Sequence, residues 1–315
     1  MIIHELRAAP SPDLARALEQ FEGQFRYPLG AHRFFRIMHG PDYPRFFRAM
    51  GEGICFVAEK DERILGVMGA AIRPLAMPDG TERDVVYLGD VKTAPAARGG
   101  RTLLRLAEAV RAWAGTRVES AYAVVMDGTT ATPVRYTGRL GIPLFSEVGK
   151  VMVLHFDSAG FTDNPDPRWL ATREMGGACY DRLSGGSYAC RGGDPSERSE
   201  MTPLWLMAPD ERACGRLEDT RRAKRLMVDD GAEMRSAHLS CFAYAEPISG
   251  AGLLRMALRQ AARHGFPGLF VSVPAGKAPA LREALNDEKL TVAPATVFGA
   301  CLESWDSWMM NSAEI

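Results

Sequence analysis

Two arginines separated by two glycines stand where an expected strand gives way to an expected helix, and together they could bind an anion. Residues 85–91 are largely apolar and β-branched, and a proline turn separates them from Arg98-Gly99-Gly100-Arg101. Apolar residues then recur at helical spacing as far as Gly115, which is expected to end the helix. The first N–H groups of a helix lack partners, and the helix dipole favours negative charge there. Glycine allows a ligand to approach the backbone closely, and the arginine side chain suits a diphosphate. The alternative is that the two arginines are ordinary solvent-exposed residues at the start of a helix.

The residues around this junction match a known cofactor-binding pattern. A strand, Tyr87-Leu88-Gly89-Asp90-Val91, leads into a loop that starts Pro95-Ala96-Ala97-Arg98-Gly99. This pattern resembles the GNAT superfamily of acyl-CoA-dependent N-acyltransferases, in which such a loop holds the CoA pyrophosphate on backbone N–H groups. The order of elements from Ile54 to Phe156 resembles the same family. Arg101 and Leu103 stand where the family prefers small residues.

The resemblance implies a co-substrate and a set of contacts. Acetyl-CoA or another acyl-CoA would be the co-substrate, with no metal required. The implied cofactor-binding residues are Val91, Lys92, Thr93, Arg98, Gly99, Gly100, Arg101, Thr102 and Leu103. The pantetheine arm would pair with the strand like an added strand, and backbone N–H groups near residues 91–93 would stabilise the tetrahedral oxyanion.

Tyr136 and Asp90 are the candidate catalytic residues. Tyr136 fills the place where family members put a tyrosine that reprotonates the CoA thiolate, although Ile142 replaces the phenylalanine that usually follows. Acylation needs a neutral amine, and Asp90 and Glu147 are the carboxylates that could accept its proton; burial would raise the pKa of Asp90 toward that use. In the alternative, the tyrosine packs on the sheet, Asp90 binds nearby backbone, and water relays the proton.

Further elements extend the pattern on both sides of the junction. Residues 54–58 and 64–68 flank a charged turn and predict a β-hairpin, and Pro78-Asp79-Gly80 predicts a second turn before the central strand. Residues 121–126 and 148–156 predict two more strands, with a short helix starting at Thr132-Pro133 between them.

The second half of the chain repeats this order. A helical stripe closed by Gly265 is followed by an expected strand at 269–273, a helix at 278–285 and a strand at 292–302. The counterpart of the arginine loop is Ser249-Gly250-Ala251-Gly252, which has no arginine. We therefore predict a degenerate second copy that helps to wall the substrate groove, with a second CoA bound through backbone alone as the alternative.

These observations predict an α/β protein of the α+β type, with two GNAT-like mixed, mainly antiparallel sheets flanked by helices. The expected division is an acyl-CoA-binding domain at 1–157, a linker at 158–200 packed on a domain face, and a degenerate GNAT-like domain at 201–315. Residues 13–25 and the aromatic and basic run 33–48 are expected to form helices over the acceptor site.

Composition limits the class of protein. The chain has 315 residues, of which 46% are apolar, and a formal net charge of −1, so it can build sizeable cores and has no overall attraction to nucleic acid. No apolar run is long enough to span a bilayer and the N-terminus lacks a signal-peptide pattern, so we expect a cytoplasmic protein. The oligomeric state is left open.

Cysteine and histidine show no metal-binding spacing. The six cysteines contain no C-x-x-C pair, and reduced thiols are expected, with an approach of Cys179 to Cys190 as the alternative. His32 and His39 are seven positions apart and are expected on one face of a helix.

Three functions fit the sequence. The leading one is transfer of an acyl group, acetyl in the first instance, from acyl-CoA to a primary amine of a small molecule or peptide. The second is synthesis of N-acyl amino acids with a long acyl chain carried on CoA or acyl-carrier protein. The third is a non-catalytic module that binds acyl-CoA or another partner.

Overall fold

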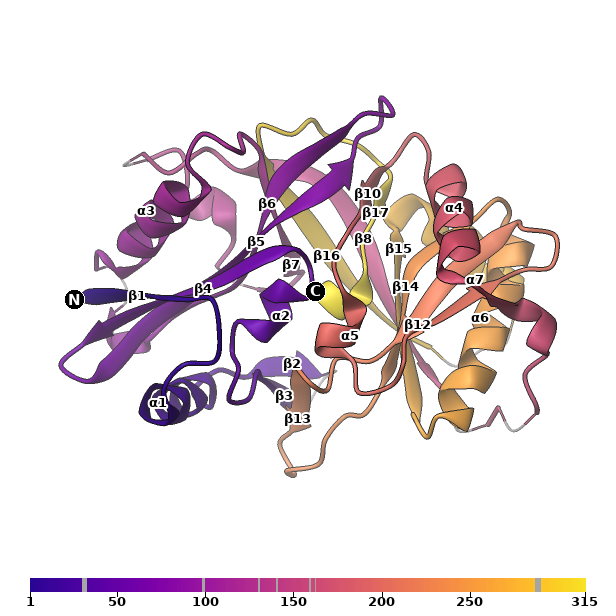
Figure 1. The fold of residues 1–315 in the computed structure, drawn as a ribbon, viewed down its shortest axis with the longest axis horizontal. Helices are drawn as coiled ribbons and strands as arrows, with labels where there is room; N and C mark the ends of the chain where they lie inside the picture. The colour runs from indigo at the N-terminus through magenta and orange to yellow at the C-terminus, as the bar shows by residue number, and fades with distance from the viewer. Residues whose placement is uncertain are drawn as a thin grey trace.

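The computed structural model describes residues 1–29, 33–97, 100–129, 131–139, 141–158, 160–161, 163–286 and 290–315. Within these residues, fourteen strands form one continuous sheet that runs through both halves of the molecule (Figure 1). Most of them follow the spatial order β1 (Ile2–Leu6), β4 (Glu52–Lys60), β5 (Arg63–Ala76), β6 (Glu82–Thr93), β7 (Ala121–Met126), β16 (Leu290–Ala300), β8 (Ser146–Asp157), β15 (Gly268–Pro274), β14 (Ala237–Tyr244), β12 (Ala213–Glu218), β11 (Leu204–Met207) and β9 (Leu170–Ala171). The short strands β10 (Tyr188–Cys190) and β17 (Trp308–Met309) pair with each other, and β10 also pairs with β5.

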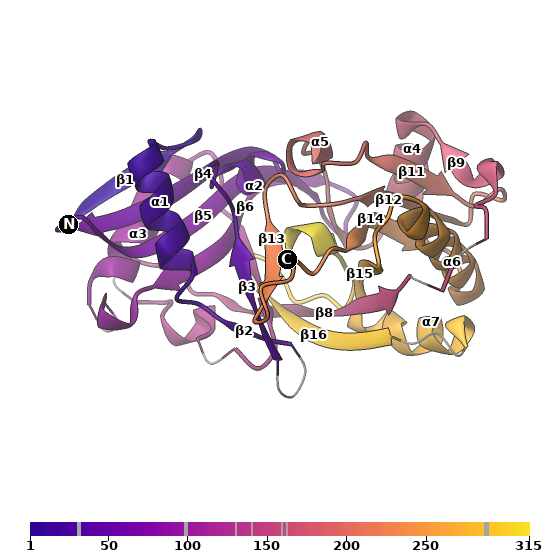
Figure 2. The same ribbon diagram turned by 90° about the horizontal axis from the view of Figure 1, so that it is seen from below.

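A small second sheet and several helices cover the main sheet. The small sheet has the order β13 (Arg225–Val228), β3 (Arg33–Met38), β2 (Tyr27–Leu29), so it combines strands from both halves of the chain (Figure 2). The helices are α1 (Pro12–Glu22), α2 (Arg45–Arg48), α3 (Thr102–Ala114), α4 (Arg173–Leu183), α5 (Pro195–Arg198), α6 (Pro247–Arg263) and α7 (Ala278–Leu285), with 3₁₀ turns η1 (Pro95–Ala97), η2 (Pro133–Arg135), η3 (Pro167–Trp169), η4 (Ala275–Lys277) and η5 (Ser312–Glu314). No helix in the described part of the chain is long and apolar enough to cross a membrane.

The central feature of the first half is a parallel strand pair that diverges. β6 and β7 pair in parallel from Val86 with Ala121 to Leu88 with Ala123, and α3 connects them. After Leu88 the pairing stops, and β6 continues beside β5 alone while β7 continues beside β16. Among the described residues, the backbone of β6 beyond Leu88 therefore has no neighbouring strand on one side.

The second half contains the same arrangement. β14 and β15 pair in parallel from Ala237 with Leu269 to Leu239 with Val271, and α6 connects them. Their pairing also stops there, after which β15 continues beside β8. The order of helix, strand, helix and strand that we predicted for each half occurs as α3, β7, η2 and β8 in the first half and as α6, β15, α7 and β16 in the second. The degenerate second copy and the division into three domains stay predictions.

The two halves exchange their last strands. β8 follows β7 in sequence but pairs with β15, and β16 follows β15 in sequence but pairs with β7. β8 and β16 also pair with each other along most of their length. The predicted fold class, a mixed and mainly antiparallel α+β arrangement flanked by helices, is confirmed, although the two expected sheets form one sheet because these long antiparallel strands join both halves.

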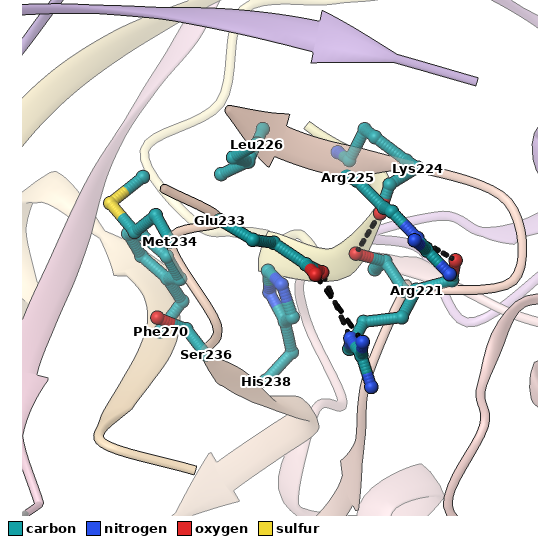
Figure 3. Close-up of a pocket in the computed structure, with 10 residues that line it drawn as sticks. Arg221, Lys224, Arg225, Leu226, Glu233, Met234, Ser236, His238 and Phe270 are labelled. Atoms are coloured by element: carbon teal, nitrogen blue, oxygen red, sulfur yellow. Dashed lines mark hydrogen bonds and ion pairs between the residues drawn. The ribbon is translucent and has the colours of Figure 1, made fainter. Parts of the chain in front are cut away.

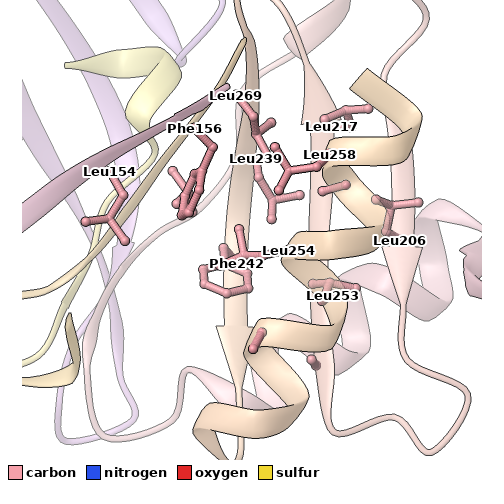
Figure 4. Packing of buried hydrophobic residues seen from close by; sticks show 14 of the residues in the cluster. Leu154, Phe156, Leu206, Leu217, Leu239, Phe242, Leu253, Leu254, Leu258 and Leu269 are labelled. Atoms are coloured by element: carbon pink, nitrogen blue, oxygen red, sulfur yellow. The ribbon is translucent and has the colours of Figure 1, made fainter. Parts of the chain in front are cut away.

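Apolar helix faces pack on the sheet to form the cores. In the second half, Leu253, Leu254 and Leu258 of α6 lie against leucines and aromatic side chains of the sheet (Figure 4). In the first half, Leu106 and Val110 of α3 belong to a core with residues of β4, β5 and β6. These faces follow from apolar residues at helical spacing, which the sequence displays.

Most of the predicted elements are confirmed, and two segments differ. The hairpin, the turn at Pro78 to Gly80, and the strands and helices of the second half occur where the sequence predicts them. The run 33–48, predicted as helix, is mostly strand β3 and a loop, because β3 gains pairing partners on both sides in the small sheet. The expected linker contains helix α4 and the strands β9 and β10. Both strands belong to the main sheet.

We predict that Gly69→Ala lowers the free energy of unfolding by about 1–3 kcal/mol, the range for overpacked cores. A Cβ on Gly69 would lie 1.8 Å from the ring of the buried Phe47. Urea denaturation measures the effect, and Gly177→Ala in α4 is the matched control because nothing lies within 4 Å of its new Cβ. The control is expected to keep or raise stability; equal stability of Gly69→Ala and the wild type would contradict the prediction.

Candidate functional site

The candidate site begins at a bulge in β6, just beyond the point where β6 and β7 diverge. Gly89 pairs with Gly69 and Lys92 pairs with Val67, so Asp90 and Val91 together face the single residue Met68. Asp90 has a φ of 53°, in the left-handed region that aspartate tolerates better than most residues. A bulge leaves one residue out of the ladder, so backbone groups here are available to a ligand.

The Asp90 carboxylate points away from solvent into a cluster of polar side chains. It accepts a short hydrogen bond from the Tyr43 hydroxyl, and its Oδ1 lies 2.6 Å from the Lys92 ammonium. The side chain is only 6% exposed. Burial opposes its ionisation, but Lys92 and the hydrogen bonds outweigh burial and lower the pKa of Asp90. The Asp90 carboxylate is ionised and already accepts hydrogen bonds from two donors. This favours a structural role for Asp90, and its predicted role as general base stays a prediction.

Two further side chains, Glu22 and His39, complete this cluster, and Tyr27 lies beside it. Glu22 of α1 accepts a 2.5 Å hydrogen bond from His39 Nδ1, and its Oε1 lies 3.4 Å from the Lys92 ammonium. Tyr27 lies beside Lys92, and burial raises the pKa of Tyr27 to about 12. Burial disfavours the charged form of Lys92. The nearby groups Asp90, Tyr27 and Glu22 outweigh burial and raise the pKa of Lys92, so its amine stays protonated. The group Glu22, His39, Tyr43, Asp90 and Lys92 is called the Asp90 cluster below.

The Asp90 cluster also contains the ligand atoms of a conceivable metal site. One atom each from Glu22, His39 and Asp90 lies within 4.8 Å of the others, the single such group among the described residues. The Lys92 ammonium already contacts both carboxylates, so a metal ion here would have to displace it. His39 follows β3 and not a helix, so its predicted helical spacing from His32 is wrong; His32 lies outside the described residues.

The predicted cofactor-binding residues that the structure describes lie at the end of β6 and at the start of α3. Arg101 is the exposed N-cap residue, and no side chain caps the helix there. Val91 is 47% exposed, whereas the side chain of Lys92 is buried in the Asp90 cluster and that of Thr102 is buried under β5. Arg98 and Gly99 lie outside the described residues. Of the remaining predicted residues, Thr93 ends β6, Gly100 precedes α3 and Leu103 lies in its first turn.

The other residues considered for proton transfer are exposed. Tyr136 follows the η2 turn as its C-cap residue and is 45% exposed, and its role as a proton donor stays a prediction. Glu147 is exposed on β8. The structure does not bring either side chain into the Asp90 cluster.

Sequence reasoning missed Lys224, a buried amine at the junction of the two halves. Its Nζ donates a 2.6 Å hydrogen bond to the main-chain oxygen of Ile315 and lies 4.6 Å from the centre of the Phe46 ring. Among the described residues no Asp or Glu side chain lies within ion-pair distance of it. Burial, helped by the positive charge of Arg198, lowers the pKa of Lys224 to about 7. Nothing in the local sequence Thr-Arg-Arg-Ala-Lys marks this lysine as buried.

Lys224 lines a small pocket between the small sheet and strands β14 and β15 (Figure 3). Arg221 pairs across the pocket wall with Glu233 at 2.8 Å. His238 lines its floor and lies 3.1 Å from the Ser312 hydroxyl. Burial and the nearby Lys224 keep the pKa of His238 well below its usual value, so this ring is neutral.

In the second half, the chain itself occupies the space where β14 and β15 diverge. Cys241 has a φ of 50°, at the place in β14 that corresponds to Asp90 in β6. Its N–H donates a 2.8 Å hydrogen bond to Asn311 Oδ1. Ser249-Gly250-Ala251-Gly252 lies within helix α6, so the predicted loop there is wrong, and the Tyr244 ring packs against Gly250.

All six cysteines are free thiols. Cys179 does not approach Cys190: its Sγ lies 3.3 Å from the Glu211 carbonyl oxygen and interacts with Cys214. Cys190 instead lies 3.5 Å from the Tyr122 hydroxyl.

We predict that Lys224 makes stability depend on pH between about 7 and 10. The unfolded chain keeps this proton to about pH 10.4, whereas the folded chain loses it near pH 7. The unfolded state therefore binds more protons in this window, and the free energy of unfolding rises with pH, by at most about 1.4 kcal/mol per pH unit. Urea denaturation of the wild type and Lys224→Met at pH 6, 8 and 9 isolates the effect. The exposed Lys60→Met is the control and should follow the wild type; parallel pH curves for Lys224→Met and the wild type would refute the prediction.

Comparison with known proteins identifies the fold. No protein-family model matches the sequence, and no curated protein matches it. The structure matches Saccharomyces cerevisiae N-myristoyltransferase with bound myristoyl-CoA at a TM-score of 0.58 and 9% identity, covering 96% of this chain and 84% of that one. A second structure of that enzyme with myristoyl-CoA gives 0.58, and one with myristoyl-CoA and inhibitors gives 0.60, each at 9% identity and covering 99% of this chain and 83% of the other. The chain therefore has the fold of N-myristoyltransferase.

Proposed function

We propose that the chain is an N-acyltransferase that moves an acyl group from acyl-CoA to a primary amine of a peptide or small molecule. The observation that carries this proposal is the open backbone of β6 where it leaves β7, beside the uncapped start of α3. The amide-rich pantetheine arm can pair with that backbone, and the first-turn N–H groups of α3 suit the pyrophosphate. Arg101 would add charge-assisted hydrogen bonds.

The reaction needs only an oriented amine and a polarised thioester. The amine nitrogen forms a bond to the thioester carbon, the carbonyl oxygen gains negative charge, and the carbon–sulfur bond then breaks. In this proposal, a backbone N–H of the Asp90–Val91 bulge stabilises that oxygen, which the break in the β5–β6 ladder supports. The amine loses one proton to water, and the departing CoA thiolate gains one, for which Tyr136 is our proposed donor.

The transferred acyl group has two candidate chain lengths. The sequence favours acetyl-CoA, whereas the structures with a matching fold contain myristoyl-CoA. Val124 and Met126 of β7 are apolar and only partly buried just past the point of divergence, where an acyl chain could contact them. We therefore propose a long-chain donor, on CoA or on acyl-carrier protein, as the second candidate.

We predict that the wild type binds acyl-CoA and that the double variant Arg98→Ala/Arg101→Ala binds it at least tenfold more weakly. Loss of charged hydrogen bonds to phosphate, at about 1.5–3 kcal/mol each, is the reason. Calorimetry with acetyl-CoA and myristoyl-CoA measures both the loss and the preferred chain length. Arg105→Ala on the exposed side of α3 is the control, since Arg105 pairs with Glu108.

Release of free CoA in the presence of primary amines tests catalysis. CoA release with a matched amine supports the transferase, and binding without release for any amine would favour the non-catalytic module. Absence of binding to either acyl-CoA would refute an acyl-CoA site.

A further inference from the structure

The Asp90 cluster is a buried set of charges that the proposed chemistry does not use directly. It contains two carboxylates, one ammonium, one imidazole and one phenol hydroxyl, and the side chains of Glu22, His39 and Lys92 are 1–3% exposed. Buried charges are costly unless each is paired and hydrogen-bonded. Here each carboxylate has both the Lys92 ammonium and a second hydrogen-bond donor, so the set is mutually compensated.

The Asp90 cluster connects the bulge to two other segments of the chain. Asp90 lies inside the bulge and Lys92 is the residue at which the β5–β6 ladder resumes. Their partners come from distant segments: Glu22 from the end of α1 and Tyr43 from the loop before α2. Tyr43 and Lys92 therefore determine the direction of the Asp90 side chain, and with it the orientation of the following peptide.

The shape of this peptide matters because it carries the N–H that would meet the thioester oxygen. Asp90 holds a φ of 53°, which an unsupported strand would not adopt. The Val91 side chain on the other side of that peptide is 47% exposed, so the bulge is buried on its Asp90 side and open on its Val91 side.

We propose that Tyr43 and Lys92 are positioning residues that hold the Asp90–Val91 bulge so that its N–H polarises the thioester carbonyl. This inference rests on the proposed N-acyltransferase function. Neither side chain touches the substrate; both act through Asp90. During the reaction the carbonyl oxygen gains charge as the carbon–nitrogen bond forms and loses it as the carbon–sulfur bond breaks, and the fixed N–H stabilises the charged stage.

The test uses Tyr43→Phe, which removes one hydroxyl, and Lys92→Met, which removes one charge at similar length. The matched controls are Tyr180→Phe, whose buried hydroxyl donates to the Met309 carbonyl oxygen, and Lys277→Met, whose ammonium lies over the Tyr244 ring. Each variant is measured for kcat, for myristoyl-CoA and acetyl-CoA affinity, and for the infrared frequency of a thioester carbonyl labelled with carbon-13 in the bound acyl-CoA.

We expect both cluster variants to bind acyl-CoA within about threefold of the wild type while kcat falls roughly 10- to 100-fold, below the upper range seen when an oxyanion donor is removed. The bound carbonyl frequency should lie below that of free acyl-CoA in the wild type and controls, and should return toward the free value in the variants. General loosening of the fold would not shift a carbonyl frequency selectively. Tyr43→Phe alone decides the matter when Lys92→Met does not fold.

The outcomes separate this inference from the function it rests on. A wild type that acylates amines, with Tyr43→Phe unchanged in both kcat and carbonyl frequency, would overturn the positioning role only. A wild type that neither binds nor consumes either acyl-CoA would overturn the function and the positioning role together.

Discussion

The pairing of β8 with β15 and of β16 with β7 is the constraint on which the rest of the molecule depends. Each half supplies the strand that completes the other half, so the sheet is continuous and the two halves cannot move apart without breaking long antiparallel ladders. The diverging ends of both parallel pairs are thereby fixed relative to each other. A contact between the halves, such as that of the Lys224 ammonium with the Phe46 ring, depends on that fixed arrangement.

A buried ion network reinforces the same junction. Glu314 accepts hydrogen bonds from Arg73 of β5 at 2.6 Å and from Arg198 of α5 at 3.1 Å. Burial opposes its charge, but the two guanidinium groups lower the pKa of Glu314 to about 2. Arg198 also binds Glu218 of β12 at 2.9 Å, so the ions join the first half, the second half and the last turn of the chain. Such a network contributes specificity of arrangement, since an unpaired member would be strongly destabilising.

Local patterns explain how much of this could be predicted from the sequence. The hairpin, the parallel strand before α3 and the helix that ends at Gly115 follow from apolar periodicity and turn residues, which are properties of short segments. Strand exchange and the helix-to-strand error at β3 depend on partners far away in the chain. Asp90 was singled out from its place on the central strand, but its partners Glu22 and Tyr43 carry no local signal, because only the fold brings them together. Lys224 was missed for the same reason.

The exchanged strands also dictate an order of events during folding. β7 is made early, yet the strand that covers its open edge, β16, lies near the other end of the sequence. The first half therefore carries an unpaired sheet edge until residues 290–300 have been synthesised, and the contacts that close it join segments far apart in the sequence. Chains dominated by such long-range contacts fold slowly, and their unpaired strand edges can associate with other chains before folding is complete. Folding of this protein on the ribosome is thus expected to be completed late and by both halves together, and not one half after the other.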